Sequence, residues 1–248
     1  MRYNRAMAQS YTVKLLGQEL VAENTPAFSF EKPEGFSFIA GQFLRLTLPA
    51  LIPENGRPNV RPFSIASAPF EPHLTVAIRT GTSDFKRALL ALPIGSSVQI
   101  AGPYGRFTLH EDASIPAVFL AGGIGVTPMR SIILQALHDR KPHRLLLFYS
   151  NRRPEDAAFL QEFQDAQKTH PNFTLIPTMT GMEASQRAWD GQTTAIDIGM
   201  LKERLPGLGS AIYFIAGPGP MVLAMREMLK TAGVPEQRIN IELFSGYA

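Results

Sequence analysis

The hydrophobic pattern changes character once, near residue 112. Between residues 11 and 109, short β-branched and aromatic runs are separated by Pro, Gly and Asn, which is typical of strands joined by turns. Several short strands at this spacing predict a closed or nearly closed antiparallel barrel. The candidate strands span residues 11–16, 27–30, 43–48, 63–66, 74–79 and 97–100.

One segment of this first region follows a different period. Apolar residues repeat at helical spacing between residues 83 and 92, so a single helix is predicted there. Ser83 is suited to the N-cap, because its hydroxyl can accept a hydrogen bond from the first turn, and Asp84 complements the positive helix end.

Beyond residue 113, apolar runs alternate with amphipathic segments. Residues 117–121 are continuously apolar, as expected of a strand buried on both faces. The alternation predicts a doubly wound parallel α/β sheet, and therefore two domains, residues 1–112 and residues 113–248. Strands are expected at 117–121, 144–149, 173–178, 211–216 and 238–244, and helices at 129–137, 154–168, 200–205 and 220–231.

Composition excludes several classes of function. Of the 248 residues, 45% are hydrophobic and 18% charged, the balance of an ordinary folded protein, and the net charge is only +3. No run of five like charges favours nucleic-acid binding. The chain has no cysteine, which excludes disulfides, a thiol nucleophile and a cysteine-ligated iron–sulfur cluster on this chain.

Location and metal content are also constrained by the sequence. The polar N-terminus predicts no signal peptide, and residues 115–129, the most apolar stretch, are too short to span a bilayer. We therefore expect a cytoplasmic protein without membrane insertion. The five histidines show no metal-binding spacing, and no Gly-x-Ser-x-Gly nucleophile motif is present.

A glycine-rich turn lies between a predicted buried strand and a predicted helix. It reads Gly122-Gly123-Ile124-Gly125-Val126-Thr127-Pro128. Small residues let the backbone approach a pyrophosphate, and the helix N-terminus offers free N–H groups. Pro128 stands where the dinucleotide fingerprint has its third glycine, so the match to that fingerprint is incomplete. Residues 216–221, Ala-Gly-Pro-Gly-Pro-Met, repeat this context after another strand.

Residues 61–64 of the first region offer three chemically different groups. Arg61 can form a forked pair with a phosphate, Phe63 provides a face for stacking, and the Ser64 hydroxyl can donate to a ring nitrogen. Taken alone, the start of a surface strand explains these residues better than a ligand site does.

Together these motifs resemble the ferredoxin–NADP(+) reductase superfamily over nearly the whole chain. Residues 61–64 are similar to its Arg-x-Tyr-Ser flavin motif and are preceded by Gly41-Gln42-Phe43. Residues 122–128 match its nucleotide turn, and residues 216–218 approach its Cys-Gly-Pro motif. Residues 102–107 and Glu242-Leu243-Phe244 match the remaining two elements in the family's order.

The resemblance implies an antiparallel Greek-key β-barrel that binds FAD, followed by a doubly wound α/β domain that binds NAD(P). Ser64 and Glu242 would serve the hydride-transfer site, with Ser64 on flavin N5. The residues implied to contact FAD are Arg61, Pro62, Phe63, Ser64, Ile78, Arg79, Ser83, Lys86, Thr127 and Phe244. Those implied to contact the nicotinamide nucleotide are Gly122, Gly123, Gly125, Thr127, Pro128, Ser150, Arg152, Arg153, Gly217, Pro218 and Met221.

Three departures from the family pattern matter. Phe63 replaces the usual Tyr, so it keeps the stacking face and loses a phenolic hydrogen bond. Ala216 replaces a frequent Cys, so no thiol stands beside the nicotinamide. The chain continues past Phe244, and Tyr247 is an alternative to Phe244 as the ring that covers the flavin.

The nucleotide and the electron acceptor are less sharply predicted. An acidic residue after the second strand of the α/β region favours NAD, whereas Ser150, Arg152 and Arg153 suit a 2′-phosphate. We therefore expect NADPH, with NADH as the alternative. The expected acceptor is an acidic one-electron carrier such as ferredoxin or flavodoxin. Alternatives are free flavin, ferric complexes or an oxygenase component, a non-catalytic electron-transfer subunit, and a binding module without flavin.

Overall fold

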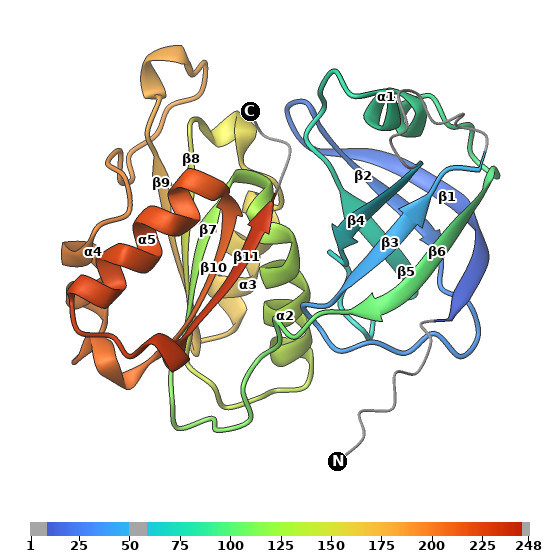
Figure 1. The fold of residues 1–248 in the computed structure, drawn as a ribbon. Helices are drawn as coiled ribbons and strands as arrows, with labels where there is room; N and C mark the ends of the chain where they lie inside the picture. Colours follow the sequence, from blue (N-terminus) through green and yellow to red (C-terminus); the bar gives the residue numbers. More distant parts are fainter. Residues whose placement is uncertain (1–8, 50–58, 245–248) are drawn as a thin grey trace.

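Two sheets lie side by side in the computed structural model, which describes residues 9–49 and 59–244 (Figure 1). Six antiparallel strands form the first sheet, in the order β4-β3-β6-β1-β2-β5. Its open ends meet just beyond β4, where Ala66 N donates to Thr75 O at 2.8 Å. The predicted antiparallel barrel is therefore confirmed. Its strands are β1 (Ser10–Ala22), β2 (Thr25–Glu31), β3 (Phe43–Thr47), β4 (Val60–Ser64), β5 (His73–Ala77) and β6 (Ser97–Tyr104).

The second sheet contains five parallel strands in the order β11-β10-β7-β8-β9. This confirms the predicted doubly wound sheet. Its strands are β7 (Ala117–Gly122), β8 (Leu145–Asn151), β9 (Phe173–Met179), β10 (Ile212–Pro218) and β11 (Ile239–Phe244). The helices are α1 (Asp84–Leu90) in the barrel region and α2 (Thr127–His138), α3 (Leu160–Thr169), α4 (Ile198–Arg204) and α5 (Gly219–Thr231) around the parallel sheet.

Alternate residues of each central strand face opposite layers of helices. Phe119 and Leu147 pack in the cluster that contains α2 and α3, whereas Leu120 and Phe148 pack with α4 and α5. Both sets are fully buried, which explains the continuous apolar run at β7. A separate cluster of seventeen buried residues fills the barrel.

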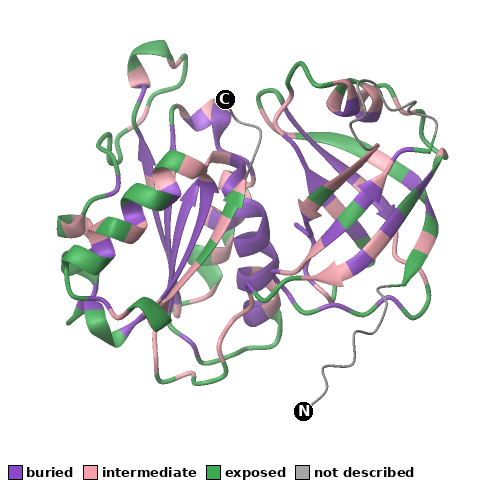
Figure 2. Ribbon diagram, in the orientation of Figure 1, coloured by how far each residue is buried: buried purple, intermediate pink, exposed green. Residues whose placement is uncertain are grey.

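Helix α2 is buried far more completely than α5. It lies between the parallel sheet and the barrel, and Figure 2 shows burial around almost its whole circumference, whereas α5 is exposed along one side. Nine of its twelve residues are buried, including Arg130 and Ser131. A helix that contacts protein on both sides must provide partners for each of its polar groups.

Two elements near the candidate site differ from the sequence prediction. The strand predicted at residues 63–66 is β4 (Val60–Ser64), so the whole of residues 61–64 lies on a strand. The helix predicted at 154–168 is interrupted: a 3₁₀ turn spans Pro154–Asp156, and α3 begins only at Leu160. Phe159 adopts a left-handed backbone, φ 60°, which an α-helix does not continue through.

Other local predictions are confirmed. The Ser83 side chain caps α1 by accepting a hydrogen bond from Lys86 N. Gly233 follows α5 with φ 84°, the left-handed conformation of a helix C-terminus. The predicted domain boundary falls in the connection between β6 and β7 and stays a prediction. Within residues 9–49 and 59–244, no helix is long and apolar enough to cross a membrane.

Gly41 lies where the barrel packs closely against α2. Its φ is 95°, and an added Cβ would lie 1.9 Å from Phe107 O and 2.8 Å from Ile132 Cδ1. We expect Gly41→Ala to lower the free energy of unfolding by about 2–4 kcal/mol, because it combines backbone strain with overpacking. Chemical denaturation measures this. The matched control is Gly17→Ala, whose Cβ would meet nothing within 4 Å; equal stability of the two variants would contradict the tight fit.

Candidate functional site

The site forms where the carboxyl ends of β7 and β10 meet. The chain runs outward from β7 in one direction to β8 and β9 and returns on the other side at β10, so a crevice opens between these two strands. A Cβ on Gly217 would approach the Gly122 backbone to 3.0–3.2 Å, and one on Gly125 would lie 2.3 Å from Ala216 O. Close backbone approach therefore requires glycine at both turns.

A cavity of about 260 Å³ occupies this crevice. Many of its lining residues belong to the sequence-predicted set, and they come from β7, β8, β10, β11 and the barrel. No carboxylate is among them. The lining residues are Arg79, Gly122, Gly123, Ile124, Ser150, Asn151, Arg152, Thr180, Gly217, Pro218, Met221 and Phe244.

Ser64 and Glu242 are 178 positions apart in the sequence and contact each other, although neither is among the residues that line this cavity. The Ser64 hydroxyl donates to Glu242 Oε1 at 3.4 Å. Glu242 lies on β11 beside Ala216 of β10. Its second carboxylate oxygen, Oε2, is buried and has no hydrogen-bond partner among the described residues. Burial raises the pKa of Glu242 to about 7, and the Ser64 hydrogen bond offsets only part of this rise.

The predicted flavin residues gather at one end of the barrel. The Arg61 guanidinium lies 5.5 Å from the centre of the Phe85 ring, and the Phe63 ring lies 5.9 Å from the same ring. Burial and the nearby positive charge of Arg79 lower the pKa of Lys86. Several cations are therefore grouped beside a flat aromatic surface, an arrangement that suits a phosphorylated planar ligand.

Some predicted residues contribute to the framework instead of the cavity lining. Thr127 is 2% exposed, and its hydroxyl donates to Ile124 O at 3.0 Å. Pro128 and Gly125 are buried beside it, and Ile78 is 1% exposed in the barrel core. Pro62 is exposed on β4.

Arg153 lies in an ion cluster between the barrel and the α/β region. Its guanidinium donates to both oxygens of Asp156 at 3.0 Å and to Glu23 of the β1–β2 turn at 3.0 Å. Arg79 joins the cluster by donating to Asp156 O at 3.0 Å. Arg153 lowers the pKa of the Asp156 carboxyl through hydrogen bonds and charge. Its partners hold Arg153 outside the cavity that Arg152 lines.

Asn151 is a site residue that sequence reasoning missed. It ends β8, is 6% exposed and lines the cavity, yet neither polar atom of its amide has a hydrogen-bond partner among the described residues. The Tyr149 hydroxyl donates to Ala158 O at 3.1 Å, and the Asn151 amide lies near enough to this hydroxyl to oppose the rise in its pKa that burial causes. Buried polar groups in folded proteins are normally paired, so this amide is a candidate ligand contact. Its place at a strand end was the only signal in the sequence.

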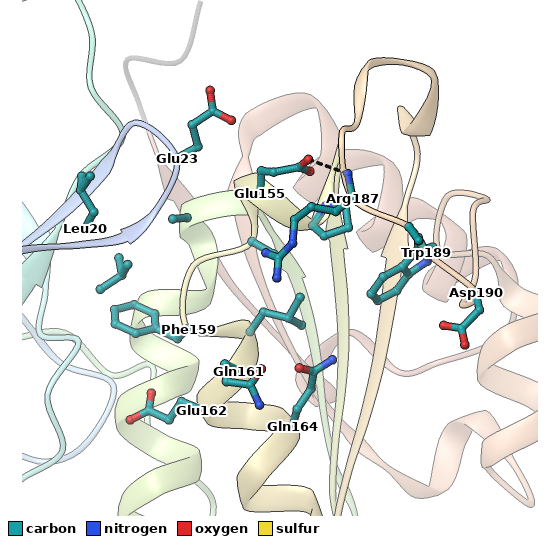
Figure 3. Close-up of a pocket in the computed structure, with 16 residues that line it drawn as sticks. Leu20, Glu23, Glu155, Phe159, Gln161, Glu162, Gln164, Arg187, Trp189 and Asp190 are labelled. Atoms are coloured by element: carbon teal, nitrogen blue, oxygen red, sulfur yellow. Dashed lines mark hydrogen bonds between the residues drawn. The ribbon is translucent and has the colours of Figure 1, made fainter.

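A larger hollow of about 660 Å³ lies beside α3 and the β1–β2 turn (Figure 3). Three of the four carboxylates that line it already have partners inside the protein. Glu23 pairs with Arg153, Glu162 pairs with Arg130, and Glu155 accepts hydrogen bonds from Ser185 and the backbone of residues 186 and 187. None of the sequence-predicted site residues lines this hollow. The chemistry therefore points to the smaller cavity.

Comparison with known proteins agrees with this fold. The family described as "Oxidoreductase NAD-binding domain" matches residues 119–227. The chain is 28% identical to the Propane 2-monooxygenase, reductase component, of Rhodococcus jostii over 228 residues, 88% of this chain and 58% of that protein. It is also 28% identical to Ferredoxin--NADP reductase B of Sorangium cellulosum, over 96% of this chain and 98% of that one.

Solved structures resemble the whole two-domain arrangement. A ferredoxin NADP+ reductase from Neisseria gonorrhoeae with bound FAD and NADP superposes with a TM-score of 0.79 at 20% identity, covering 95% of this chain and 99% of that one. The Amycolatopsis cytochrome P450 reductase GcoB gives 0.80 at 24% identity, covering 98% and 73%. By contrast, the chain spans only 58% and 55% of the R. jostii reductase component and of a Rhizobium meliloti flavohemoprotein.

The fold defines a class: two-domain proteins in which an antiparallel barrel is followed by a nucleotide-binding α/β domain. Within that class, the chain resembles the ferredoxin–NADP(+) reductase type of FAD/NAD-binding oxidoreductases, as its match to the NAD-binding domain and its relatives indicate. The cofactor classes predicted from the sequence agree with the ligands named in its relatives.

The raised pKa of Glu242 generates a prediction about stability. The folded protein holds a proton on this carboxyl up to about pH 7, whereas an unfolded Glu releases it near pH 4.5, so this group makes stability fall between those values as pH rises. We expect Glu242→Gln to reduce that fall, when unfolding free energies from denaturant titrations at pH 5 and pH 8 are compared. The same pH dependence in both proteins would contradict the burial of this carboxyl.

Proposed function

We propose that this chain is an FAD-dependent reductase that takes a hydride from NADPH and passes electrons to a separate acceptor. The observation that carries the proposal is the Ser64–Glu242 contact, which joins a barrel strand to the last strand of the nucleotide-binding sheet. FAD, when bound, supplies the conversion between two-electron and one-electron chemistry. The protein binds and orients the two cofactors and excludes water from the path between them.

The described residues fit FAD on the barrel side. Arg61, Arg79 and Lys86 supply positive charge for the pyrophosphate, and Phe63 supplies the stacking face. Burial, and after it the charge of Arg79, lowers the pKa of Lys86, and a bound diphosphate would favour the charged form of this side chain. Phe244 lines the cavity at the end of β11 and is proposed to cover the second flavin face. Tyr247, the alternative, lies outside the described residues.

The residues at the hydride path are proposed to handle a proton. Glu242 has a pKa of about 7, so near neutral pH it can either hold or release one. The Ser64 hydroxyl is positioned to donate either to this carboxylate or to a ring nitrogen, because one O–H can turn between acceptors. Neither residue acts as a nucleophile in this scheme.

The cavity favours NADPH over NADH. Arg79 and Arg152 line it together with Ser150 and Thr180, and none of the described lining residues carries a carboxylate that could accept a hydrogen bond from a ribose 2′-hydroxyl. The unpaired amide of Asn151 adds a donor and an acceptor at the same strand end. Arg153 is proposed to serve the ion cluster between the domains and not the nucleotide.

The proposed acceptor is an acidic one-electron carrier such as ferredoxin or flavodoxin, supported by the ferredoxin–NADP reductase of S. cellulosum, which matches this chain nearly end to end. A second candidate function is that of the reductase component of an oxygenase, as in the R. jostii relative. NADPH-driven reduction of ferredoxin, free flavin and ferric chelates distinguishes these roles. A marked preference for ferredoxin supports the first, and equal rates for all three contradict it.

The FAD assignment is tested on the purified chain. We expect it to bind FAD and show flavin absorbance near 450 nm; a protein that takes up no added FAD contradicts the proposal. Arg61→Ala should weaken FAD binding by roughly tenfold to hundredfold, because a charge-assisted pair with phosphate is lost. Fluorescence titration of the apoprotein measures this. Lys14→Ala, an exposed change on β1, is the matched control and should bind FAD normally.

Two neighbouring arginines provide a test of nucleotide choice. Arg152→Ala should raise the KM for NADPH roughly tenfold or more and leave the KM for NADH nearly unchanged, because only NADPH carries the 2′-phosphate. Arg153→Ala should leave the ratio of the two KM values unchanged, since its side chain faces Asp156 and Glu23. A larger NADPH effect in Arg153→Ala than in Arg152→Ala would show that the assignment of these two residues is inverted.

A further inference from the structure

Arg130 is a charged residue buried in the contact between the two domains. It lies in the first turns of α2, and its side chain is only 9% exposed. Burying a guanidinium is unfavourable unless every N–H finds an acceptor. The hydrogen-bond partners of Arg130 therefore indicate its role in the structure. Neither the cavity nor the proposed proton path uses Arg130.

All five N–H groups of Arg130 are hydrogen-bonded. Nη1 donates to Ala66 O at 2.8 Å and to Glu71 Oε2 at 2.9 Å, and Nη2 donates to Glu71 Oε1 at 3.0 Å. The other edge pairs with Glu162, through Nε at 2.7 Å and Nη2 at 2.7 Å. The guanidinium carbon also lies 4.9 Å from the centre of the Phe159 ring. Figure 3 shows Phe159 and Glu162 together near the start of α3.

These partners belong to different parts of the molecule. Ala66 and Glu71 are on the barrel loop that joins β4 to β5, whereas Glu162 is on α3 of the α/β region. Helix α2 holds the same loop at further points: Ser131 Oγ donates to Ser67 O at 2.7 Å. The barrel loop of residues 66–71, which we call the clamp loop, is therefore fixed to α2 along more than one turn.

The clamp loop and α2 each continue directly from one half of the candidate site. Ala66 follows Ser64 of the flavin strand by two residues, and Arg130 follows Thr127 at the end of the nucleotide turn by three. So short a connection transmits any shift of the clamp loop to Ser64. We infer that Arg130 is a positioning residue that fixes the flavin strand relative to the nucleotide turn, and so sets the geometry of hydride transfer.

The charges around Arg130 indicate what its loss would do. Glu71 and Glu162 belong to opposite domains, and both form ion pairs with the guanidinium of Arg130. Without it, two carboxylates would face each other across the domain contact and repel. A lysine keeps the charge, but its compact ammonium has three donors and lacks the planar fork that spans both carboxylates.

The inference rests on the proposed function and is tested on the FAD-loaded protein. Arg130→Met is mixed rapidly and anaerobically with NADPH, and flavin absorbance is followed. We expect reduction at least about tenfold slower than in the wild type, with FAD content unchanged, because small misplacements of reacting groups cost large factors in rate. The charge-transfer absorbance of the complex between reduced flavin and NADP⁺, which depends on ring overlap, should also weaken.

Two further variants separate positioning from general destabilisation. Arg130→Lys should recover part of the rate, since it keeps the charge. Arg226→Met removes a half-buried arginine of α5 that pairs with Glu236, far from the domain contact in the sequence, and it should reduce flavin at the wild-type rate. Should Arg130→Met fail to fold, Glu71→Gln and Glu162→Gln weaken the same contact, and both should slow reduction.

The outcomes are distinguishable. A folded Arg130→Met protein, or both glutamine variants, with reduction rate and charge-transfer band within twofold of the wild type would overturn the inference alone. A wild-type protein that binds FAD but is not reduced by NADPH or NADH would overturn the proposed function, and the inference with it. Slow reduction in Arg130→Met, partial recovery in Arg130→Lys and a normal Arg226→Met support the positioning role.

Discussion

The arrangement of this protein depends on the burial of α2 between two separate cores. One side of the helix packs on the parallel sheet, and the other meets the barrel, where the Gly41 backbone lies against Ile132. A helix in this position cannot leave polar groups to water. Its hydroxyls and its arginine therefore find partners in the adjoining loops, as Thr127 and Ser131 do. The same contacts that stabilise the helix bring the barrel segment that follows β4 close to the helix that follows residues 122–126.

The domain contact and the site treat polar groups in opposite ways. At the contact, Arg130 has all five donors paired, and the cluster of Arg153, Asp156 and Glu23 is likewise satisfied. At the site, Glu242 Oε2 and the Asn151 amide are buried and have no hydrogen bond of standard geometry to any described residue. Unsatisfied groups cost free energy and persist where the surrounding structure fixes them. The fully hydrogen-bonded domain contact fixes the structure around the site. The groups without partners at the site are free to bind a ligand or, in the case of Glu242, to hold a proton.

Local features of the fold were predictable because nearby residues determine them. The apolar run of β7, the cap at Ser83 and the glycine turn at 122–128 follow from short-range sterics and burial. The break before α3 was not predictable, because the left-handed Phe159 places its ring beside Arg130, a contact made only in the folded chain. The partners of Arg153 illustrate the same limit: Asp156 is three residues away, but Glu23 is 130 away.

In the candidate site too, the local motifs were predictable from the sequence and the contacts between distant residues were not. The sequence motifs predicted which turns and strands would supply it, and many of their residues line one cavity. Sequence spacing could not predict that the partly buried Glu242 would lie beside Ser64, since the two residues are brought together by the packing of β11 against β10 and of the barrel against α2. Asn151 was missed because an amide at a strand end carries no distinctive pattern until its burial is known.

The central claim is that the barrel and the α/β domain hold flavin and nicotinamide together for direct hydride transfer. The most direct measurement is anaerobic reduction of the FAD-loaded protein by NADPH carrying deuterium at C4 of the nicotinamide. We expect the flavin to be reduced, with a primary isotope effect for deuterium on the transferred face. Reduction without an isotope effect on either face would contradict hydride transfer as the step that this geometry controls, and absence of reduction would contradict the function itself.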